Sequence, residues 1–455
     1  MPPGEPPHPQ ALFSLVPANE RAKSILTYRD NDHLVSSFRP YPNNPTVVVQ
    51  GLDVGFHVRS AAGCTLAIIG RKGDIQLNDL DISPYHCSFE LHEHNRGEVM
   101  LQDRSLDNST QLFGPAAMPF KPGHPHRRVL VDQNINLLFG IGGAACDLYQ
   151  FEIHWHGRDE SMVRQCIDTR LGNPSHARTI SYEPPTSVSC LPFGRIRYSK
   201  RERLGSGTFG EVWKVANADT GAQLAVKRIK TPRSDSYQSF SLKREVDMLS
   251  RVSHTNIIKY ITSQSADDGH FDIFMELKSG SVQYLITEDQ LFARSTDSAY
   301  SLLFQMLQAL DCLANVGMIH RDVKPENILF TPLSDGQYLY QLADFGLANL
   351  AVNAQTYAGT KPYMAPEVYQ GSRQPQTVKM DIWSLFVTLA YAMNAAGFQR
   401  KPRHSREQVF KAVWEAANWV RLRQFREMAI EDPDYRATAG DMLDKAFFGE
   451  GRTTS

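Results

Sequence analysis

"MIHRDVKPENILF", Met318–Phe330, is the stretch that decides the fold, and related motifs surround it on both sides. "LGSGTFGEVWKV" and "LAVKRIK" precede it, and "LADFGLANL" and "GTKPYMAPEVY" follow it. The order and spacing of these five motifs suit a single catalytic cleft. A chance coincidence of all five is negligible, so the C-terminal half of the chain is predicted to be an enzyme domain.

The first of these motifs places three glycines between two apolar runs: Gly205, Gly207 and Gly210. Glycines at this spacing let backbone amides approach nucleotide phosphates, which side chains would block. A dinucleotide-binding fold would need a helix to begin inside the run, whereas Val212 and Val215 continue as a strand. Lys227 follows where a third strand would present an amine to the phosphates. From this motif alone, an ordinary surface lysine remains the alternative.

Together the five motifs resemble the eukaryotic protein-kinase fold, over roughly Ile196 to Phe448. The resemblance implies a bilobal α+β domain that uses ATP and Mg²⁺. It implies that Asp322 orients the substrate hydroxyl and that Lys324 steadies the transferred phosphoryl group. Asn327 and Asp344 would hold magnesium.

The same resemblance assigns the nucleotide site and its supports. Glu245 would pair with Lys227, Met275 would be the gatekeeper, and the backbones of Glu276 and Leu277 would bind adenine. Glu367 and Arg436 would form a buried structural pair. The full set expected to bind ATP is Leu204, Gly205, Gly207, Gly210, Val212, Ala225, Lys227, Met275, Glu276 and Leu277.

Lys324 and Thr360 resemble the pattern of serine/threonine kinases, and "HRDVKPENILF" is similar to calmodulin-dependent and checkpoint kinases. The Arg321 guanidinium is expected to bind a phosphate on the activation segment. Thr356 is the expected phosphorylation site in that segment, modified by a second copy of the chain, which predicts transient self-association.

The N-terminal part reads as strands. In "YQFEIHWH", Tyr149, Phe151 and Ile153 alternate with polar residues, which is typical of a half-buried strand. "CSFELHEH" alternates in the same way, and turn-forming residues separate such runs. We therefore predict an all-β sandwich.

Three segments of this part, "IIGRKGDIQL", "ISPYHCSF" and "LQDRSLDNSTQLFG", resemble in order the signatures of a forkhead-associated (FHA) domain. This resemblance implies that the loops bind a phosphothreonine-containing partner. A phosphate dianion is matched by a guanidinium and a hydroxyl donor, here Arg71 and Ser83. Asn108 would grip the peptide main chain and His86 would brace its own loop. Ser109 stands where the family usually has glycine.

These assignments divide the chain into five parts. The predicted parts are a partly disordered N-terminal extension (1–45), an FHA domain (46–156), a linker (157–194), a kinase domain (195–449) and a tail (450–455). The 455 residues are 42% apolar and carry a net charge of −1, so no global attraction to nucleic acid or to acidic membranes is expected. The N-terminus lacks a signal pattern and the cysteines lack metal-site spacing, which favours an intracellular, soluble protein of the nucleus and/or cytoplasm.

An FHA domain followed by one kinase domain resembles the DNA-damage checkpoint kinases. The predicted function is transfer of the ATP γ-phosphoryl group to serine or threonine of protein substrates, with recruitment or activation through phosphothreonine. Two alternatives stay open. In one, the chain is a phosphopeptide-binding scaffold with a nearly silent kinase module; in the other, the FHA domain is a structural inhibitor of an active kinase.

Overall fold

The computed structural model describes residues 5–40, 44, 46–58, 60, 63–92, 97–122, 127–171, 194–207, 210–230, 252–344, 361–369, 376–403 and 405–453. By its contacts the chain divides into two compact units. The first comprises Met1–Glu202 and Lys214–Leu224, and the second comprises Arg203–Trp213 and Ala225–Ser455.

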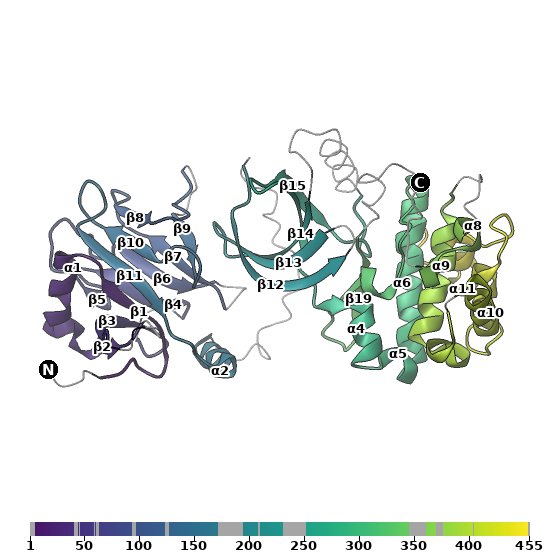
Figure 1. Cartoon of the computed structure of the whole chain (residues 1–455), viewed down its shortest axis with the longest axis horizontal. Helices are drawn as coiled ribbons and strands as arrows, with labels where there is room; N and C mark the ends of the chain where they lie inside the picture. The colour runs from purple at the N-terminus through teal and green to yellow at the C-terminus, as the bar shows by residue number, and fades with distance from the viewer. Residues whose placement is uncertain are drawn as a thin grey trace. The chain divides into compact units, whose positions relative to one another are not determined.

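The first unit contains two β-sheets (Figure 1). One has the strand order β2-β3-β1-β11-β10-β8, with bounds Val35–Phe38, Val49–Gly55, Ala11–Pro17, Tyr149–Trp155, Leu138–Ile141 and Thr110–Phe113. The other has the order β5-β4-β6-β7-β9, with bounds Ile75–Gln76, Thr65–Gly70, Cys87–Leu91, Val99–Asp103 and Arg128–Val131. All neighbouring strands are antiparallel except β4 and β5, which are parallel.

A shared apolar core packs the two sheets face to face. Phe13 of β1 meets Phe89 of β6 with ring centroids 5.0 Å apart, and Phe89 meets Phe139 of β10 at 5.7 Å. On β11 the apolar residues Phe151 and Ile153 are buried, while their polar neighbours are only partly covered. The predicted all-β architecture and the alternation of this strand are therefore confirmed.

The predicted N-terminal extension (1–45) needs correction, because residues before 46 already belong to the sandwich. β1 pairs with β3 on one side and β11 on the other, with Leu15 opposite both Leu52 and Ile153. The first five residues of β1 are buried. Because β1 pairs with a strand on each side and its first five residues are buried, it is a central strand of the sandwich, and the boundary predicted at residue 46 is wrong.

The predicted linker also needs correction over part of its length. Residues Glu160–Leu171 form helix α2, and the carboxylate of Asp159 accepts hydrogen bonds from the backbone N–H groups of Ser161 and Met162. Ile167 is buried in the sandwich core. The Arg170 guanidinium donates to the carbonyls of Val58 and Thr65. This helix therefore belongs to the first unit, and residues 172–193 of the predicted linker lie outside the described residues.

A further β-sheet has five strands in the order β12-β13-β14-β16-β15. Their bounds are Tyr198–Gly207, Gly210–Asn217, Gln223–Lys230, His270–Glu276 and Tyr260–Ser265. Helices dominate the rest of the second unit: α4 (Val282–Thr287), α5 (Leu291–Arg294), α6 (Thr296–Asn315), α8 (Pro366–Tyr369), α9 (Lys379–Ala392), α10 (Arg406–Ala417) and α11 (Ala439–Phe447). A small sheet, β17 (Gly280–Ser281), β18 (Ile328–Pro332) and β19 (Tyr338–Leu342), accompanies them.

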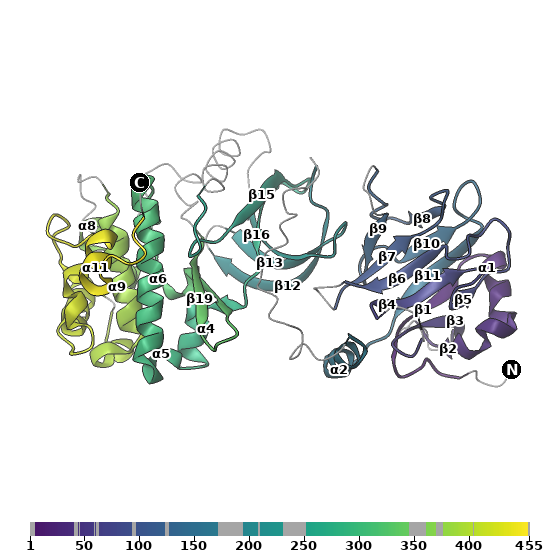
Figure 2. The same cartoon turned by 180° about the vertical axis from the view of Figure 1, so that it is seen from behind.

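One continuous core runs from this five-stranded sheet into the helices. Helix α6 contacts β19 on one side and α9 and α11 on the other, as the view from behind shows (Figure 2). Its residues Leu303, Met306, Leu310 and Leu313 are buried, which confirms the predicted apolar face. Helix α9 is buried almost all round. Among the described residues, no helix has the length and apolar character needed to cross a membrane.

Candidate functional site

The glycine-rich segment joins β12 to β13. Gly210 has a φ of 140°, and a Cβ built there would lie 2.1 Å from the Arg228 carbonyl oxygen, so a side chain is excluded at this position. A Cβ at Gly205 would have no neighbour within 4 Å, which leaves open space beside its backbone. Thr208 and Phe209, between the two strands, lie outside the described residues.

Lys227 on β14 points to the acidic residue of the "ADFG" motif. Its ammonium forms an ion pair with the carboxylate of Asp344, and the lysine side chain is 7% exposed against 40% for the aspartate. Asp344 has a φ of 60°, a left-handed conformation that non-glycine residues rarely adopt and that is often found at functional sites. Glu245, the predicted partner of Lys227, lies outside the described residues.

The residues predicted to surround adenine line the same core. Ala225 and Met275 are buried in it, and Val212 and Leu277 pack against it. The backbone N–H of Glu276 donates to the Lys259 carbonyl at 3.4 Å. Leu204, by contrast, is half exposed at the end of the glycine-rich strand.

The "HRDVKPEN" segment gathers three polar side chains. The ammonium of Lys324 lies 2.7 Å from the Asp322 carboxylate. The amide nitrogen of Asn327 donates to the Asp322 carboxylate at 2.9 Å and to its carbonyl at 2.8 Å. The N–H of Ala343 donates to the Asn327 carbonyl, which brings Asp344 next to this cluster. The structure thus unites Asp322, Lys324 and Asn327 with the Lys227–Asp344 pair.

Asp381 of α9 holds the backbone of this segment. The sequence motifs did not predict this role. Its carboxylate accepts the backbone N–H groups of His320 and Arg321 at 2.7 and 2.8 Å. Full burial raises the pKa of Asp381, and the neighbouring His320 partly opposes that shift. The sequence does contain a signal for it: an aspartate near the start of an otherwise apolar helix, in "MDIWS". A buried acid in such a helix needs a specific partner.

The donor set at the cleft fits a magnesium ion. Because the amide nitrogen of Asn327 donates to Asp322, its amide oxygen is left as the acceptor, and Asp344 adds a carboxylate. Mg²⁺ prefers such hard oxygen ligands and takes few of them from protein when phosphates complete the shell. Asn327 and Asp344 would hold the ion, whose chemistry there is to neutralise the charge of the transferred phosphoryl group.

Two further predicted features have different outcomes. The Arg436 guanidinium meets the Glu367 carboxylate through two hydrogen bonds of 2.7 and 2.9 Å, and both residues are buried, which confirms this pair. Arg321 has a φ of 72°. Thr356, the expected phosphorylation site, lies in residues 345–360, outside the described part of the chain.

A second set of predicted residues lies on the sandwich loops. The N–H of Arg71 donates to the Ser83 carbonyl at 3.2 Å, and its Nε donates to the Ile82 carbonyl at 2.7 Å. A Cβ at Gly70 would lie 2.5 Å from the Pro84 carbonyl oxygen, so glycine permits the two loops to approach. Arg71 and Ser83 are therefore brought together.

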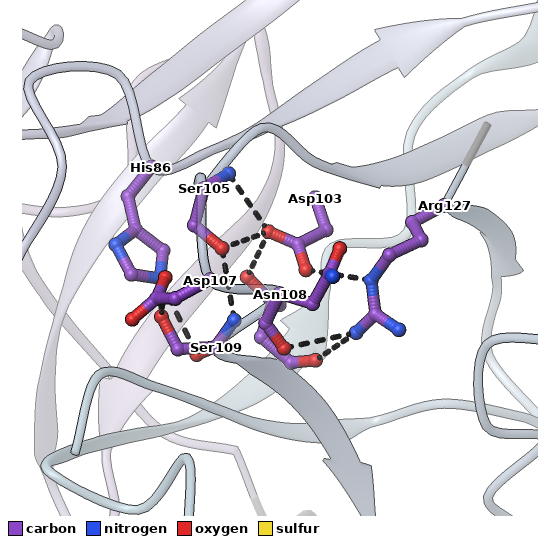
Figure 3. A network of polar contacts seen from close by, with 8 residues as sticks. His86, Asp103, Ser105, Asp107, Asn108, Ser109 and Arg127 are labelled. Atoms are coloured by element: carbon purple, nitrogen blue, oxygen red, sulfur yellow. Dashed lines mark hydrogen bonds and ion pairs between the residues drawn. The ribbon is translucent and has the colours of Figure 1, made fainter. Parts of the chain in front are cut away.

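His86 connects these loops to the one that carries Asn108, and Figure 3 shows it beside Ser109 of that loop. Its Nδ1 accepts the Ser83 N–H at 3.2 Å, which assigns the proton to Nε2, 3.3 Å from the Ser109 carbonyl. The His86 side chain is fully buried. Asn108 itself has a φ of 57°, whereas Ser109 is not among the described residues with positive φ.

Comparisons with known proteins identify relatives of this chain among the protein kinases. The protein kinase domain family matches residues 198–448, more than half of the chain. DNA damage response protein kinase DUN1 of Saccharomyces cerevisiae is 26% identical over 440 residues, which cover 84% of this chain and 82% of that protein.

Two other relatives are similar over shorter stretches. Serine/threonine-protein kinase DCLK2 of Ailuropoda melanoleuca is 28% identical over 64% of this chain and 38% of its own length. Serine/threonine-protein kinase dst2 of Dictyostelium discoideum is 34% identical over 41% of this chain and 16% of its own length. The chain thus spans well under half of these two relatives. The family match together with the assembled cleft shows that the chain belongs to the protein kinase family.

Proposed function

We propose that this chain is an active serine/threonine protein kinase that transfers the γ-phosphoryl group of ATP to protein substrates with the help of Mg²⁺. The observation that carries the proposal is that Lys227, Asp344, Asp322, Lys324 and Asn327 are gathered at one site. The serine/threonine kinases among the relatives support the choice of acceptor.

In this proposal each side chain performs one step of positioning. The Asp322 carboxylate accepts the proton of the substrate hydroxyl and orients its oxygen toward the phosphoryl group. Lys324, already 2.7 Å from that carboxylate, stabilises the charge that develops on the transferred oxygens. Lys227 would bind the nucleotide phosphates and Asp344 would hold the metal ion, so the ion pair between them places both groups at the nucleotide.

The test is phosphoryl transfer from γ-labelled ATP to matched peptides that contain serine, threonine or tyrosine as the only acceptor. We expect transfer to serine or threonine that depends on magnesium and disappears in Asp344→Ala. Equal, background-level transfer by the wild type and Asp344→Ala would instead favour a phosphopeptide-binding scaffold with a silent kinase module.

We further propose that the β-sandwich is an FHA domain that recruits the kinase to phosphothreonine. The proposal is supported by the linked loops of Arg71, Ser83 and Asn108, which would bind the phosphate and the peptide main chain. The near full-length similarity to DUN1 supports a two-part chain of this kind.

Binding of a degenerate phosphothreonine peptide pool tests this second part. Arg71→Ala should weaken binding by at least about tenfold, because a guanidinium–phosphate contact contributes on the order of 2 kcal/mol. Lys72→Ala, which removes a neighbouring exposed cation, is the matched control. Equal binding of Arg71→Ala and wild type, or equal binding of the unphosphorylated pool, would rule out this role.

The signalling pathway of this chain is proposed only from its similarity to DUN1. DUN1 is named a DNA damage response kinase, so we propose a comparable signalling role in the nucleus or cytoplasm, with phosphorylated proteins as partners. The measurement is the activity of the chain recovered from cells before and after DNA breakage. Unchanged activity and unchanged phosphorylation would remove the checkpoint role while leaving the kinase intact.

A further inference from the structure

A buried carboxylate organises the loop that carries Asn108. We call residues Ser105–Ser109, between β7 and β8, the Asn108 loop. Asp103, the last residue of β7, has a fully buried side chain. It accepts hydrogen bonds from the N–H and hydroxyl of Ser105 at 3.0 and 2.7 Å and from the Thr110 hydroxyl at 3.0 Å. Both ends of the loop are therefore fastened to one side chain.

Arg127 completes this arrangement from a different part of the chain (Figure 3). Its Nε donates to Asp103 at 2.9 Å, and its Nη2 donates to the carbonyls of Asn108 and Thr110 at 3.2 and 3.0 Å. The guanidinium carbon lies 4.7 Å from the centre of the Phe120 ring, which limits its freedom. One planar group thus holds the buried acid and the backbone of Asn108 together.

The conformation held in this way is a demanding one. Asn108 has a φ of 57°, which is sterically unfavourable for residues with a side chain, although asparagine tolerates it better than most. Ser109 follows it and is also fixed by side chains: its N–H donates to the Ser105 hydroxyl and its own hydroxyl to Asp107. The loop shape therefore depends on hydrogen bonds from side chains and does not depend on a glycine at 109.

We propose that Arg127 is a positioning residue for phosphothreonine recognition: it holds Asn108 in the left-handed conformation from which its amide binds the peptide main chain. The inference rests on the proposed function of the sandwich. Arg127 acts through the Asn108 carbonyl and makes no contact with the peptide itself.

A simpler role would be neutralisation of the Asp103 charge. Lysine can neutralise a carboxylate, but it lacks the planar fork that donates in fixed directions to an acid and to carbonyls at once. Arg127→Lys therefore separates the two roles. Charge neutralisation predicts full binding by the lysine variant, whereas positioning predicts weakened binding with the fold retained.

The experiment measures fluorescence anisotropy of a labelled degenerate phosphothreonine peptide pool with the full chain. We expect Arg127→Lys to weaken binding about tenfold, the effect of losing one or two net hydrogen bonds to the loop backbone. Arg104→Lys is the matched control, because the Arg104 side chain donates to Ser88 and Glu90 and, within the described residues, makes no hydrogen bond to Asn108. This control should bind like the wild type.

A double-mutant cycle with Asn108→Ala provides the decisive readout. If Arg127 acts through the Asn108 side chain, Arg127→Lys adds no further loss in the Asn108→Ala background. Additive losses, or wild-type binding by Arg127→Lys, would overturn the proposal. Should Arg127→Lys lower the melting temperature, Arg127→Gln is measured in the same cycle, with the same expected and overturning results.

Arg71→Ala is included so that the two proposals fail separately. If Arg71→Ala binds the pool as well as the wild type, phosphothreonine recognition itself fails. If Arg71→Ala loses binding while both Arg127 variants keep it, only the positioning role of Arg127 is overturned.

Discussion

The ammonium of Lys227 and the carboxylate of Asp344, 117 positions apart in the chain, form an ion pair. In the kinase family these two groups serve the nucleotide phosphates and the metal ion separately. Here they form an ion pair with each other, so each charge meets an opposite one. Removing either group leaves the other without its partner and also removes one contact to the nucleotide.

Substitution of either member should therefore abolish catalysis. We expect Lys227→Met and Asp344→Asn to lower the initial rate of phosphoryl transfer by about a hundredfold or more, the usual effect of removing one preorganised charge. The rate is measured with γ-labelled ATP and a serine peptide. Lys230→Met, at the exposed end of the same strand, is the matched control and should keep its rate. Near-normal rates in either cleft variant would contradict the assignment.

Asp322 should affect turnover far more than nucleotide binding. Its carboxylate lies beside Lys324 and Asn327 and would act on the acceptor hydroxyl, so Asp322→Asn removes the proton acceptor and keeps the shape. We expect kcat to fall by about two to four orders of magnitude while the ATP dissociation constant changes little. Calorimetry with ATP and a single-turnover assay measure the two effects. Asp335→Asn, on an exposed turn, is the control; retained turnover in Asp322→Asn would show the role to be wrong.

The buried Glu367–Arg436 pair should matter for stability. Breaking such a pair leaves an uncompensated buried charge, so Glu367→Ala is expected to lower the free energy of unfolding by about 3–5 kcal/mol. Urea unfolding of the full chain measures it. Asp444→Ala breaks an exposed pair with Arg452 and should cost less than about 1 kcal/mol. Equal losses in the two variants would contradict this difference in burial.

The sequence allowed accurate prediction of elements whose pattern is local. Helix α6 shows its buried residues at helical spacing, and β11 shows simple alternation, because each buries one face against a single core. Strand β1 was missed because it is buried along most of its length and has no alternation. Helix α2 was missed because its polar composition hides a short apolar face around Ile167.

The site shows the same limit. The motifs identified Asp322, Lys324 and Asn327, which are close in sequence and in space. They did not reveal Asp381 or Arg127, since each acts on the backbone of a distant segment. Asp103 was missed as well, because its main long-range partner is the side chain of Arg127. Backbone carbonyls and N–H groups have no sequence signature, so residues that hold a loop by its main chain become visible only in the folded protein.

The buried His86 predicts a pH-dependent sandwich. Burial lowers the pKa of His86 below its ordinary value of 6.5, an effect that Ser109, Asp103 and Asp107 partly oppose. The unfolded chain therefore binds a proton near pH 6.5 that the folded chain binds only at lower pH. The contribution to stability is complete above 6.5 and is lost as the pH falls below it.

Hydrogen exchange of the β6 peptide, corrected for intrinsic rates, should thus show lower protection at pH 5.5 than at pH 7.5. His57 and His156 also have pKa values lowered by burial and add to the slope. His86→Gln should consequently reduce the slope without removing it. Identical pH slopes in the variant and the wild type would count against the buried neutral histidine.

Activation is the remaining prediction, and it rests on Arg321. Its backbone N–H is fixed by Asp381 and its φ is 72°, while its guanidinium makes no hydrogen bond or ion pair within the described residues. With its backbone fixed in this way, Arg321 can offer its guanidinium to a phosphate on the activation segment. We propose that Thr356 supplies that phosphate and that a second copy of the chain adds it.

Thr356→Ala should accordingly lower the activity of purified enzyme about tenfold or more, and Arg321→Ala should lower it similarly because the phosphate then has no partner. Transfer between copies is tested with Asp322→Asn chains as substrate, since these cannot modify themselves. Mass spectrometry should find phosphate on Thr356 of the inactive chains only after active enzyme and ATP are added. Tyr357→Phe, at the adjacent hydroxyl, is the matched control. Full activity of an enzyme whose Thr356 is unmodified would refute this mechanism, and modification of Thr356 without active enzyme would identify a different kinase as its source.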